Sequence, residues 1–190
     1  MDKVLQVRSL SKRHGPGCPA CYDKTGPAFE SNICTDCGSV VAAHDISFDL
    51  HEGEILGIMG ESGSGKSTVV NCLYFNQEPS AGRATFFDRG HAYHLFQLNK
   101  AQQRRLSNQR FGMVHQNPHL GLNFDISAGG NIAERLLMSE VYHYADIRRR
   151  ATGLLSRTEV PPERMDELPK NFSGGMQQRV QIAKALATSP

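Results

Sequence analysis

The chain has 190 residues, 39% of them hydrophobic and 21% charged, and its formal net charge is +2. This length suits one domain with at most a small insert, and so small a net charge gives, by itself, no strong case for a nucleic-acid or membrane-binding surface. No segment approaches the roughly 18 apolar residues of a membrane span, and the N-terminus lacks the apolar core of a signal peptide, so we expect a cytoplasmic protein.

The first part of the chain has strand patterns interrupted by an insert. Alternating apolar and polar residues at 3–10 and 44–54 predict strands. Residues 15–43 break this pattern with Gly, Pro and Cys and indicate an inserted segment. The short, continuously apolar run at 54–60 is typical of a buried parallel strand, and a helix is predicted to follow at 66–75.

The second part of the chain is mostly helical. Ile147, Ala151, Leu154 and Leu155 recur at helical spacing, which predicts that one face of their helix is buried. The predicted elements are a short strand at 83–87, a polar helix at 99–110, a strand at 111–116, and helices at 131–138, 145–157 and 173–190.

The sequence GESGSGKST at 60–68 matches the phosphate-loop pattern G-x-x-x-x-G-K-[ST]. Glycines allow successive backbone N–H groups to point at a phosphate, and the following helix adds the partial positive charge of its N-terminus. Lys66 is expected to reach the β- and γ-phosphates, and the Ser67 hydroxyl to ligate Mg²⁺. A Gly- and Ser-rich turn without a ligand is the alternative. The loop residues expected to contact ATP are Gly60, Glu61, Ser62, Gly63, Ser64, Gly65, Lys66, Ser67 and Thr68.

Two further features follow the phosphate loop in order. Gln116 ends a predicted strand, and the sequence FSGGMQQR at 172–179 places two glycines at the start of a helix with Ser173 as its N-cap. Taken alone, the second feature fits an ordinary capped helix. The three features in this order, a phosphate loop, a glutamine at a strand end and a helix that begins with two glycines, form a much more specific pattern than the helix start alone.

On these residues the chain resembles the ATP-binding-cassette (ABC) ATPases. GESGSGKST resembles their Walker A motif, Gln116 in VHQNP their Q-loop glutamine, and FSGGMQQ their signature motif. The resemblance covers nearly all residues outside the insert. It implies a homodimer or a pair of ABC subunits with ATP in the interface, with Lys66 and Gln116 in catalysis and Ser67 and Gln116 on Mg²⁺. The signature residues that it implies to contact the partner's ATP are Ser173, Gly174, Gly175 and Gln177.

The resemblance also implies an adenine contact and a fold. The family's adenine-stacking aromatic corresponds by position to His14, although an ordinary surface histidine fits the sequence equally well. The implied fold is α/β, a P-loop NTPase core with an antiparallel β edge and a helical subdomain. The domains predicted in this way are 1–116 for the nucleotide-binding core with the insert 15–43, 117–172 for the helical subdomain and 173–190 for the signature helix.

Three stretches, 53–73, 111–137 and 166–190, look like the ABC subunit of bacterial carbon–phosphorus lyase systems, which degrade phosphonates. The ATPases of peptide and nickel importers are the alternative, and they more usually have Glu where this chain has Gly130 before Asn131-Ile132. The resemblance implies that the partner is the carbon–phosphorus lyase core complex, or a membrane permease in the alternative. In both readings ATP shifts an open–closed equilibrium of two subunits.

Four of the five cysteines, Cys18, Cys21, Cys34 and Cys37, form the pattern C-x2-C-x12-C-x2-C. Two such pairs supply four thiolates for a tetrahedral Zn²⁺. The insert has almost no apolar residues for a core of its own, and zinc can contribute about 10–16 kcal/mol of folding free energy to such a segment. A reduced, disordered loop or a redox-active pair is the alternative. The fifth cysteine, Cys72, is predicted to be a small buried residue.

The resemblance implies that a Walker B strand, a D-loop and a switch histidine follow the signature helix, and none of them lies within residues 1–190. The family uses the Walker B carboxylates to hold Mg²⁺ and to place the attacking water. We therefore expect this chain to bind nucleotide but to hydrolyse little ATP. We also expect it to be poorly soluble, because the edge of an apolar strand would be left uncovered. A front part of a longer ATPase and a short nucleotide-binding or assembly subunit without turnover both fit the sequence.

Overall fold

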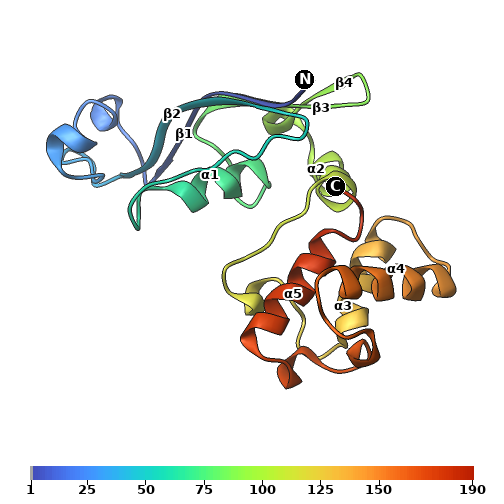
Figure 1. Ribbon diagram of the computed structural model, residues 1–190. Coiled ribbons are helices and arrows are strands. Elements are labelled where there is room, and N and C mark those ends of the chain that lie inside the picture. The colour runs from blue at the N-terminus through green and yellow to red at the C-terminus, as the bar shows by residue number, and fades with distance from the viewer. Residues whose placement is uncertain (1) are drawn as a thin grey trace. The chain divides into compact units, whose positions relative to one another are not determined.

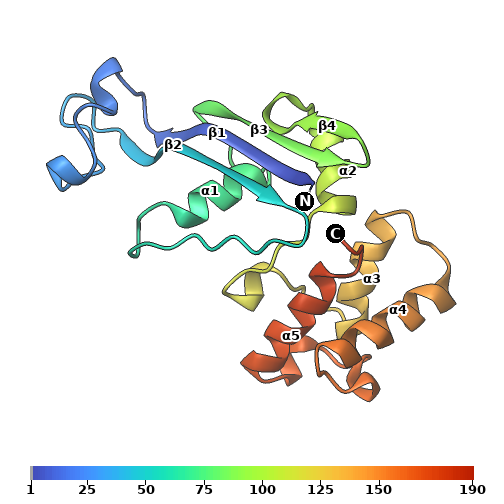
Figure 2. The ribbon, with the colours of Figure 1, turned by 45° about the horizontal axis from the view of Figure 1, so that its top comes forward.

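The computed structural model describes residues 2–190 of the chain (Figures 1 and 2). They divide into two compact units, the first ending at Gln103 and the second beginning at Arg104. Within residues 2–190, no helix combines the length and the apolar character that crossing a membrane requires.

The first unit is built on an antiparallel sheet with the strand order β2-β1-β3-β4. The sheet places β2 at one edge, next to β1, and the short β4 at the other. Its strands are β1 (Lys3–His14), β2 (Val40–His51), β3 (Ala81–Asp88) and β4 (His91–His94). The strands predicted at 3–10, 44–54 and 83–87 are confirmed, although β1 continues to His14, and β2 begins earlier than predicted, at Val40, and ends earlier, at His51.

Helix α1 (Lys66–Leu73) lies against one face of this sheet (Figure 1). Its buried residues are Val69 and Cys72, which confirms the prediction of a buried Cys72. On the sheet, Val7 and Leu10 are completely buried, and they pair across β1 and β2 with Phe48 and Ile46 respectively. A register shift between Val7 and Leu10, where Ser9 has a φ of +50°, interrupts the strict period-2 alternation along β1.

Two predicted strands, 54–60 and 111–116, are wrong: both segments are irregular and have no ladder partner among the described residues. Ile55 is 97% exposed and Met59 94% exposed, against the expectation of a buried strand. A continuously apolar strand is stable only when neighbouring strands pair with it and helices cover its faces. The described sheet is wholly antiparallel and supplies no parallel neighbour for either segment.

The second unit is helical. α2 (Lys100–Arg110) begins in the first unit and continues into the second, which also contains α3 (Ala128–Met138), α4 (Tyr144–Arg157) and α5 (Gly174–Ala185). The helices predicted at 99–110, 131–138, 145–157 and 173–190 are confirmed, although α5 ends at Ala185, before the predicted end. The apolar faces of α3, α4 and α5 share one core, which includes Ile132, Leu136, Ile147, Leu155, Val160 and Val180.

Short 3₁₀ turns connect these elements, several of them opened by a proline. They are Pro19–Cys21, Pro27–Phe29, Leu95–Gln97, Pro118–Leu120, Pro162–Arg164 and Pro169–Asn171.

Candidate functional site

The predicted phosphate loop, residues 60–65, is a solvent-facing turn in front of α1. Gly60, Gly63 and Gly65 have φ angles of +153°, +83° and +88°, which L-residues with side chains rarely adopt. The loop therefore needs glycine at these positions to keep its shape. A phosphate-binding turn of this kind directs backbone N–H groups inward.

Lys66, the first residue of α1, folds its side chain back over the loop. Its Nζ donates to the carbonyl oxygens of Gly60 at 2.9 Å and Glu61 at 2.5 Å, and lies 3.4 Å from the Ser64 hydroxyl. The ammonium group is thus held against the loop by its oxygen atoms. A phosphate entering the loop would compete with these carbonyl oxygens and gain a charge-assisted hydrogen bond.

α1 adds its own polarity to this loop. The first N–H groups of a helix have no partner within the helix, and the helix dipole places partial positive charge at the same end. Ser67 is exposed in the first turn, so that its hydroxyl is accessible to a cation beside bound phosphate. Thr68 follows it and is half-buried.

Gly65 is also held by a close contact with the sheet. A Cβ at this position would lie 1.8 Å from the carbonyl oxygen of Ala42 in β2, well inside van der Waals contact. The backbone of the phosphate loop therefore rests directly on the edge strand. The position of Ala42 fixes where the loop can sit.

The four cysteines of the insert come together in one cluster. Their Sγ atoms all lie within 4.8 Å of one another, with Cys18 3.7 Å from Cys21 and 3.6 Å from Cys34, and Cys21 3.5 Å from Cys37. A tetrahedron of thiolates at the usual Zn–S length of about 2.3 Å has edges of about 3.8 Å. Disulfide bonds would need sulfurs about 2.05 Å apart. The cluster thus has the size of a tetrathiolate metal centre.

Ser39 joins the two halves of this cluster and is fully buried. Its hydroxyl accepts a hydrogen bond from the Gly17 N–H at 2.8 Å and lies 3.2 Å from Cys37 Sγ. Its backbone carbonyl accepts from the Cys34 N–H at 2.8 Å. One small residue therefore fixes both Cys-x-x-Cys turns.

The cysteine thiols differ in acidity because their surroundings differ. Hydrogen bonds from the hydroxyl and the backbone of Ser39 lower the pKa of Cys37 to about 6. Desolvation, together with hydrogen bonds to the other cysteines, raises the pKa of Cys18 to about 12. Four neighbouring thiols cannot all ionise unless a cation compensates the charge, and a divalent metal supplies that charge.

The predicted signature residues open α5 in the second unit. The Ser173 hydroxyl accepts from the Met176 N–H at 3.4 Å, as an N-cap does. Ser173, Gly174 and Gly175 are exposed, and a Cβ on either glycine would meet no atom within 4 Å. This helix start is therefore open to an incoming group.

Gln177 and Gln178 have internal partners. The side-chain amide of Gln177 donates to the carbonyl oxygens of Pro169 and Phe172 at 3.0 and 3.1 Å, so that it stabilises the turn before α5. The side chain of Gln178 donates to the carbonyl oxygen of His115 at 3.1 Å. Gln116 itself is exposed, in a bend before the 3₁₀ turn Pro118–Leu120.

The predicted site residues thus lie in two groups. The phosphate loop and His14 belong to the first unit, whereas Gln116 and the signature residues belong to the second. His14 is the last residue of β1, is exposed and pairs with Val40.

Sequence reasoning missed Ser39 and the stack of Tyr22 on His44, whose rings are 4.2 Å apart and nearly parallel. The Gly-Ser pair directly after the last Cys-x-x-Cys could have indicated Ser39. Nothing in the sequence pairs Tyr22 with His44.

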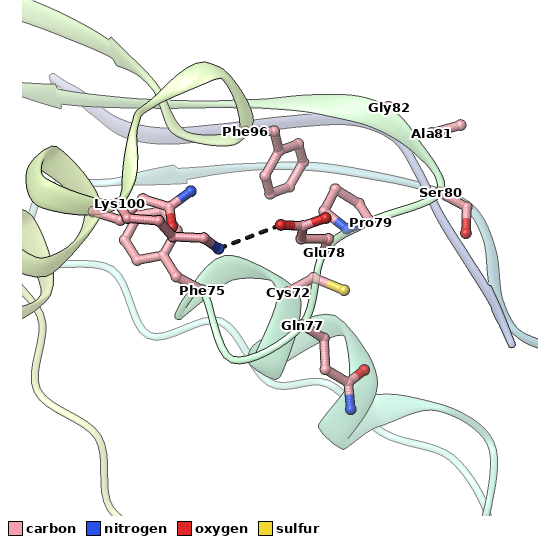
Figure 3. A pocket seen from close by; sticks show the side chains of 11 residues that line it. Cys72, Phe75, Gln77, Glu78, Pro79, Ser80, Ala81, Gly82, Phe96 and Lys100 are labelled. Atoms are coloured by element: carbon pink, nitrogen blue, oxygen red, sulfur yellow. Dashed lines mark hydrogen bonds and ion pairs between the residues drawn. The ribbon is translucent and has the colours of Figure 1, made fainter.

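The first unit also contains a cavity of about 280 Å³, at the C-terminal end of α1 (Figure 3). Figure 3 shows the ion pair between Lys100 and Glu78, 3.3 Å apart, beside the rings of Phe75 and Phe96. The cavity lies at the opposite end of α1 from the phosphate loop. Its volume is below the roughly 300–1,000 Å³ typical of ligand pockets, so that it does not replace the loop as the candidate nucleotide site.

A family model described as ABC transporter matches residues 43–190. Among curated proteins, the phosphonates utilization ATP-binding protein PhnK of Escherichia coli K12 is 47% identical over 77% of this chain and 56% of its own length. A peptide import ATP-binding protein of Brucella abortus is 36% identical over 88% of this chain and 52% of its own length. This chain therefore spans about half the length of these relatives.

Solved structures agree with this match. The dimeric post-hydrolysis state of the ATP-binding cassette MJ0796 with ADP and Pi superposes with a TM-score of 0.76 at 25% identity, over 98% of this chain and 70% of that chain. The structure of cbiO1 from Clostridium perfringens, part of the ABC transporter complex cbiONQ, gives a TM-score of 0.71 at 23% identity. The predicted α/β fold of an ATP-binding cassette is confirmed.

Proposed function

This chain belongs to the ABC transporter family of ATP-binding proteins, and on that premise we propose that the whole protein hydrolyses ATP to support the use of phosphonates. The phosphate loop carries this proposal. Its positive-φ glycines, the Lys66 ammonium held against the loop and the N-terminus of α1 would together form a receptor for the phosphates of ATP.

Mg²⁺ would accompany the nucleotide. The Ser67 hydroxyl and the Gln116 side-chain oxygen are the ligands that we propose for it, because oxygen donors suit this hard cation. Bound Mg²⁺ would neutralise charge on the transferred phosphoryl group. Lys66 and Gln116 are the residues of this chain that we assign to catalysis, and His14 is proposed to contact the adenine ring.

We propose that two ABC subunits close on ATP. The exposed start of α5, with Ser173, Gly174 and Gly175, would bind the nucleotide of the partner subunit through its free N–H groups. Gln177 would join these contacts if its side chain left the carbonyl oxygens of Pro169 and Phe172. The dimeric form of the similar cassette supports this arrangement.

The identity of 47% to a phosphonates utilization protein, against 36% to a peptide import protein, favours phosphonate use. The carbon–phosphorus lyase core complex is the partner that we propose on this basis. Import of peptides with a membrane permease is the second candidate, since that relative matches a larger share of this chain. The cytoplasm is the proposed compartment, because five unbridged cysteines suit a reducing environment.

Zn²⁺ is the metal that we propose for the cysteine cluster, because four thiolates at tetrahedral spacing suit it. Metal analysis of the full-length protein should find one zinc per chain. Cys34→Ser should lose that zinc. Cys72→Ala, which removes a buried cysteine outside the cluster, should keep it.

Nucleotide titration of the full-length protein tests the phosphate loop. Wild type should bind a fluorescent ATP analogue in the presence of Mg²⁺, and Lys66→Ala should bind it at least about tenfold more weakly, because a charge-assisted hydrogen bond to phosphate is lost. Turnover assays on the same samples separate an ATPase from a subunit that binds without hydrolysis. Equal affinity of the two proteins would overturn the assignment of the loop.

Growth assays separate the two biological roles. A strain deleted for the gene should fail to grow on a phosphonate as sole phosphorus source. Plasmid-borne wild type should restore growth, and Lys66→Ala should not. Normal growth on phosphonate, combined with a defect in peptide uptake, would replace the lyase role by the importer role.

A further inference from the structure

The cysteine module, residues 15–39, is joined to the start of β2 rather than hanging from it. The Val41 N–H donates to the carbonyl oxygen of Asn32 at 2.8 Å, and Ile33 forms an isolated bridge with Val40. Tyr22 stacks on His44 with ring centroids 4.2 Å apart. Ser39, which fixes both cysteine turns, directly precedes the strand.

β2 depends on these contacts because it is the edge strand of the sheet. Its partner on one side is β1, and its pairing with β1 is irregular near the module, with register shifts between Leu10 and Arg13. Along the first residues of β2, the cysteine module supplies the contacts on the other side. An edge that loses its partner residues exposes unpaired backbone groups and frays.

The phosphate loop rests on this same part of β2. Gly65 approaches the Ala42 carbonyl oxygen so closely that no side chain would fit between them. Ala42 lies one residue after Val41, which the module holds, and two residues before His44. A continuous chain of contacts therefore runs from the cysteine cluster through residues 40–44 to the loop that would receive phosphate.

The cysteine module has little apolar packing of its own. Within residues 15–39 the buried side chains are Cys21, Cys34 and Ser39, and the two large apolar residues, Phe29 and Ile33, are more than half exposed. Such a segment has no apolar core to compensate the loss of chain entropy. Without a bound metal, few other interactions would keep the cysteine module folded.

We infer that metal occupancy of the cysteine cluster sets the affinity of the phosphate loop for nucleotide. The inference rests on the proposed binding of Zn²⁺ and ATP. With Zn²⁺ bound, the module holds residues 40–44 and Gly65 keeps its contact with Ala42. Without Zn²⁺, the start of β2 frays and the phosphate loop samples other conformations. The apparent affinity for nucleotide then falls in proportion to the fraction of molecules whose loop has the binding conformation.

The first experiment compares the full-length protein with its zinc and after treatment with a zinc-selective chelator, in excess Mg²⁺. A fluorescent ATP analogue is the probe. We expect the dissociation constant to rise about tenfold when about one loop in ten is binding-competent. Adding Zn²⁺ back should restore the affinity, and Cys72→Ala should respond as wild type does.

Hydrogen exchange on the same samples locates the change. Peptides covering 15–39, 40–44 and 60–65 should exchange faster without zinc, whereas peptides in 104–190, a separate compact unit, should not change. Unchanged affinity in a chelated sample whose 15–39 peptides exchange freely would overturn the inference. Failure of zinc-loaded wild type to bind the analogue would instead overturn the proposed nucleotide site.

A milder variant keeps the test valid if the chelated protein unfolds. His44→Ala removes the stack with Tyr22 and leaves all four cysteines, so that zinc content should stay at one per chain. We expect about threefold weaker binding of the analogue, the value of one aromatic pair. The control is His51→Ala, at the far end of β2, which should bind as wild type does. Equal affinity of both histidine variants and wild type would contradict the coupling.

Discussion

The side-chain amide of Gln178 donates a hydrogen bond of 3.1 Å to the backbone carbonyl oxygen of His115. This bond ties α5, the helix with the proposed contacts to a partner's ATP, to the residue before Gln116. Both residues belong to the second unit. This bond is one of the contacts that couple the segment around Gln116 to α5, because the backbone of Gly112 also lies close to the Ala185 carbonyl oxygen.

Replacing Gln178 should release this segment. Gln178→Met keeps the length of the side chain but loses the donor, and should lower the free energy of unfolding by about 1 kcal/mol. Gln178→Glu should cost more, because its carboxylate would face the carbonyl oxygen. Hydrogen exchange of residues 113–117 should speed up in the same order. Equal exchange in wild type and both variants would show that the bond does not hold the segment.

Gly65→Ala should damage the phosphate loop much more than Gly57→Ala. At Gly65 the φ angle is +88° and a Cβ would lie 1.8 Å from the Ala42 carbonyl oxygen, whereas a Cβ at Gly57 meets nothing within 4 Å. Backbone strain alone costs about 1–3 kcal/mol, and the steric overlap adds to it. Thermal unfolding and titration with the ATP analogue should both show the difference. Similar values for the two variants would mean that the loop does not rest on β2.

The sequence predicted those features that depend on local spacing. Glycines at fixed positions predicted the turn before α1, where three of them have positive φ angles, and the two Cys-x-x-Cys pairs predicted the cluster whose Sγ atoms the fold brings within 4.8 Å. Helical periodicity predicted α3, α4 and α5, because one apolar face per helix is enough to build their shared core.

Features that depend on distant partners were not predictable. The apolar run at 54–60 has the composition of a buried strand, but a strand forms only where another strand pairs with it, and composition carries no information on pairing. The stack of Tyr22 on His44 joins residues on two different segments. The contact of Gly65 with Ala42 likewise follows from the path of the chain in space.

Acid should destabilise the pairing of β1 with β2. The Arg8 guanidinium, followed by the Lys3 ammonium, holds the pKa of Asp49 well below its ordinary value. A carboxylate with a depressed pKa in the folded state contributes stability above the unfolded pKa of about 3.9, and this contribution is lost as the pH falls below that value. Stability should therefore decrease as the pH falls below about 4, because Asp49 becomes protonated in the unfolded state while it stays ionised in the folded state.

Asp49→Asn tests this pH dependence, because it removes the titrating group and keeps the shape of the side chain. Urea unfolding at several pH values should show a weaker acid dependence in Asp49→Asn than in wild type, and a lower stability at neutral pH. Arg8→Met should change the acid dependence in the same direction. Parallel curves for wild type and Asp49→Asn would assign the acid sensitivity to other groups.

Arg135 on α3 should be one of the most sensitive residues of the second unit. It is only 9% exposed, and its guanidinium donates to the backbone carbonyl oxygens of Ser107 and Phe111 and to the Asn108 side chain. Arg135→Met would leave these buried acceptors without a donor and should cost about 2–4 kcal/mol of unfolding free energy.

Arg149→Met is the control for this prediction. The Arg149 side chain is 74% exposed beside Asp146, so its loss should change the free energy of unfolding by less than about 0.5 kcal/mol. Chemical unfolding of the full-length protein, with hydrogen exchange of residues 107–111 as a local reporter, measures both. If the two variants unfold at the same denaturant concentration, the buried guanidinium does not hold α2 and α3 together.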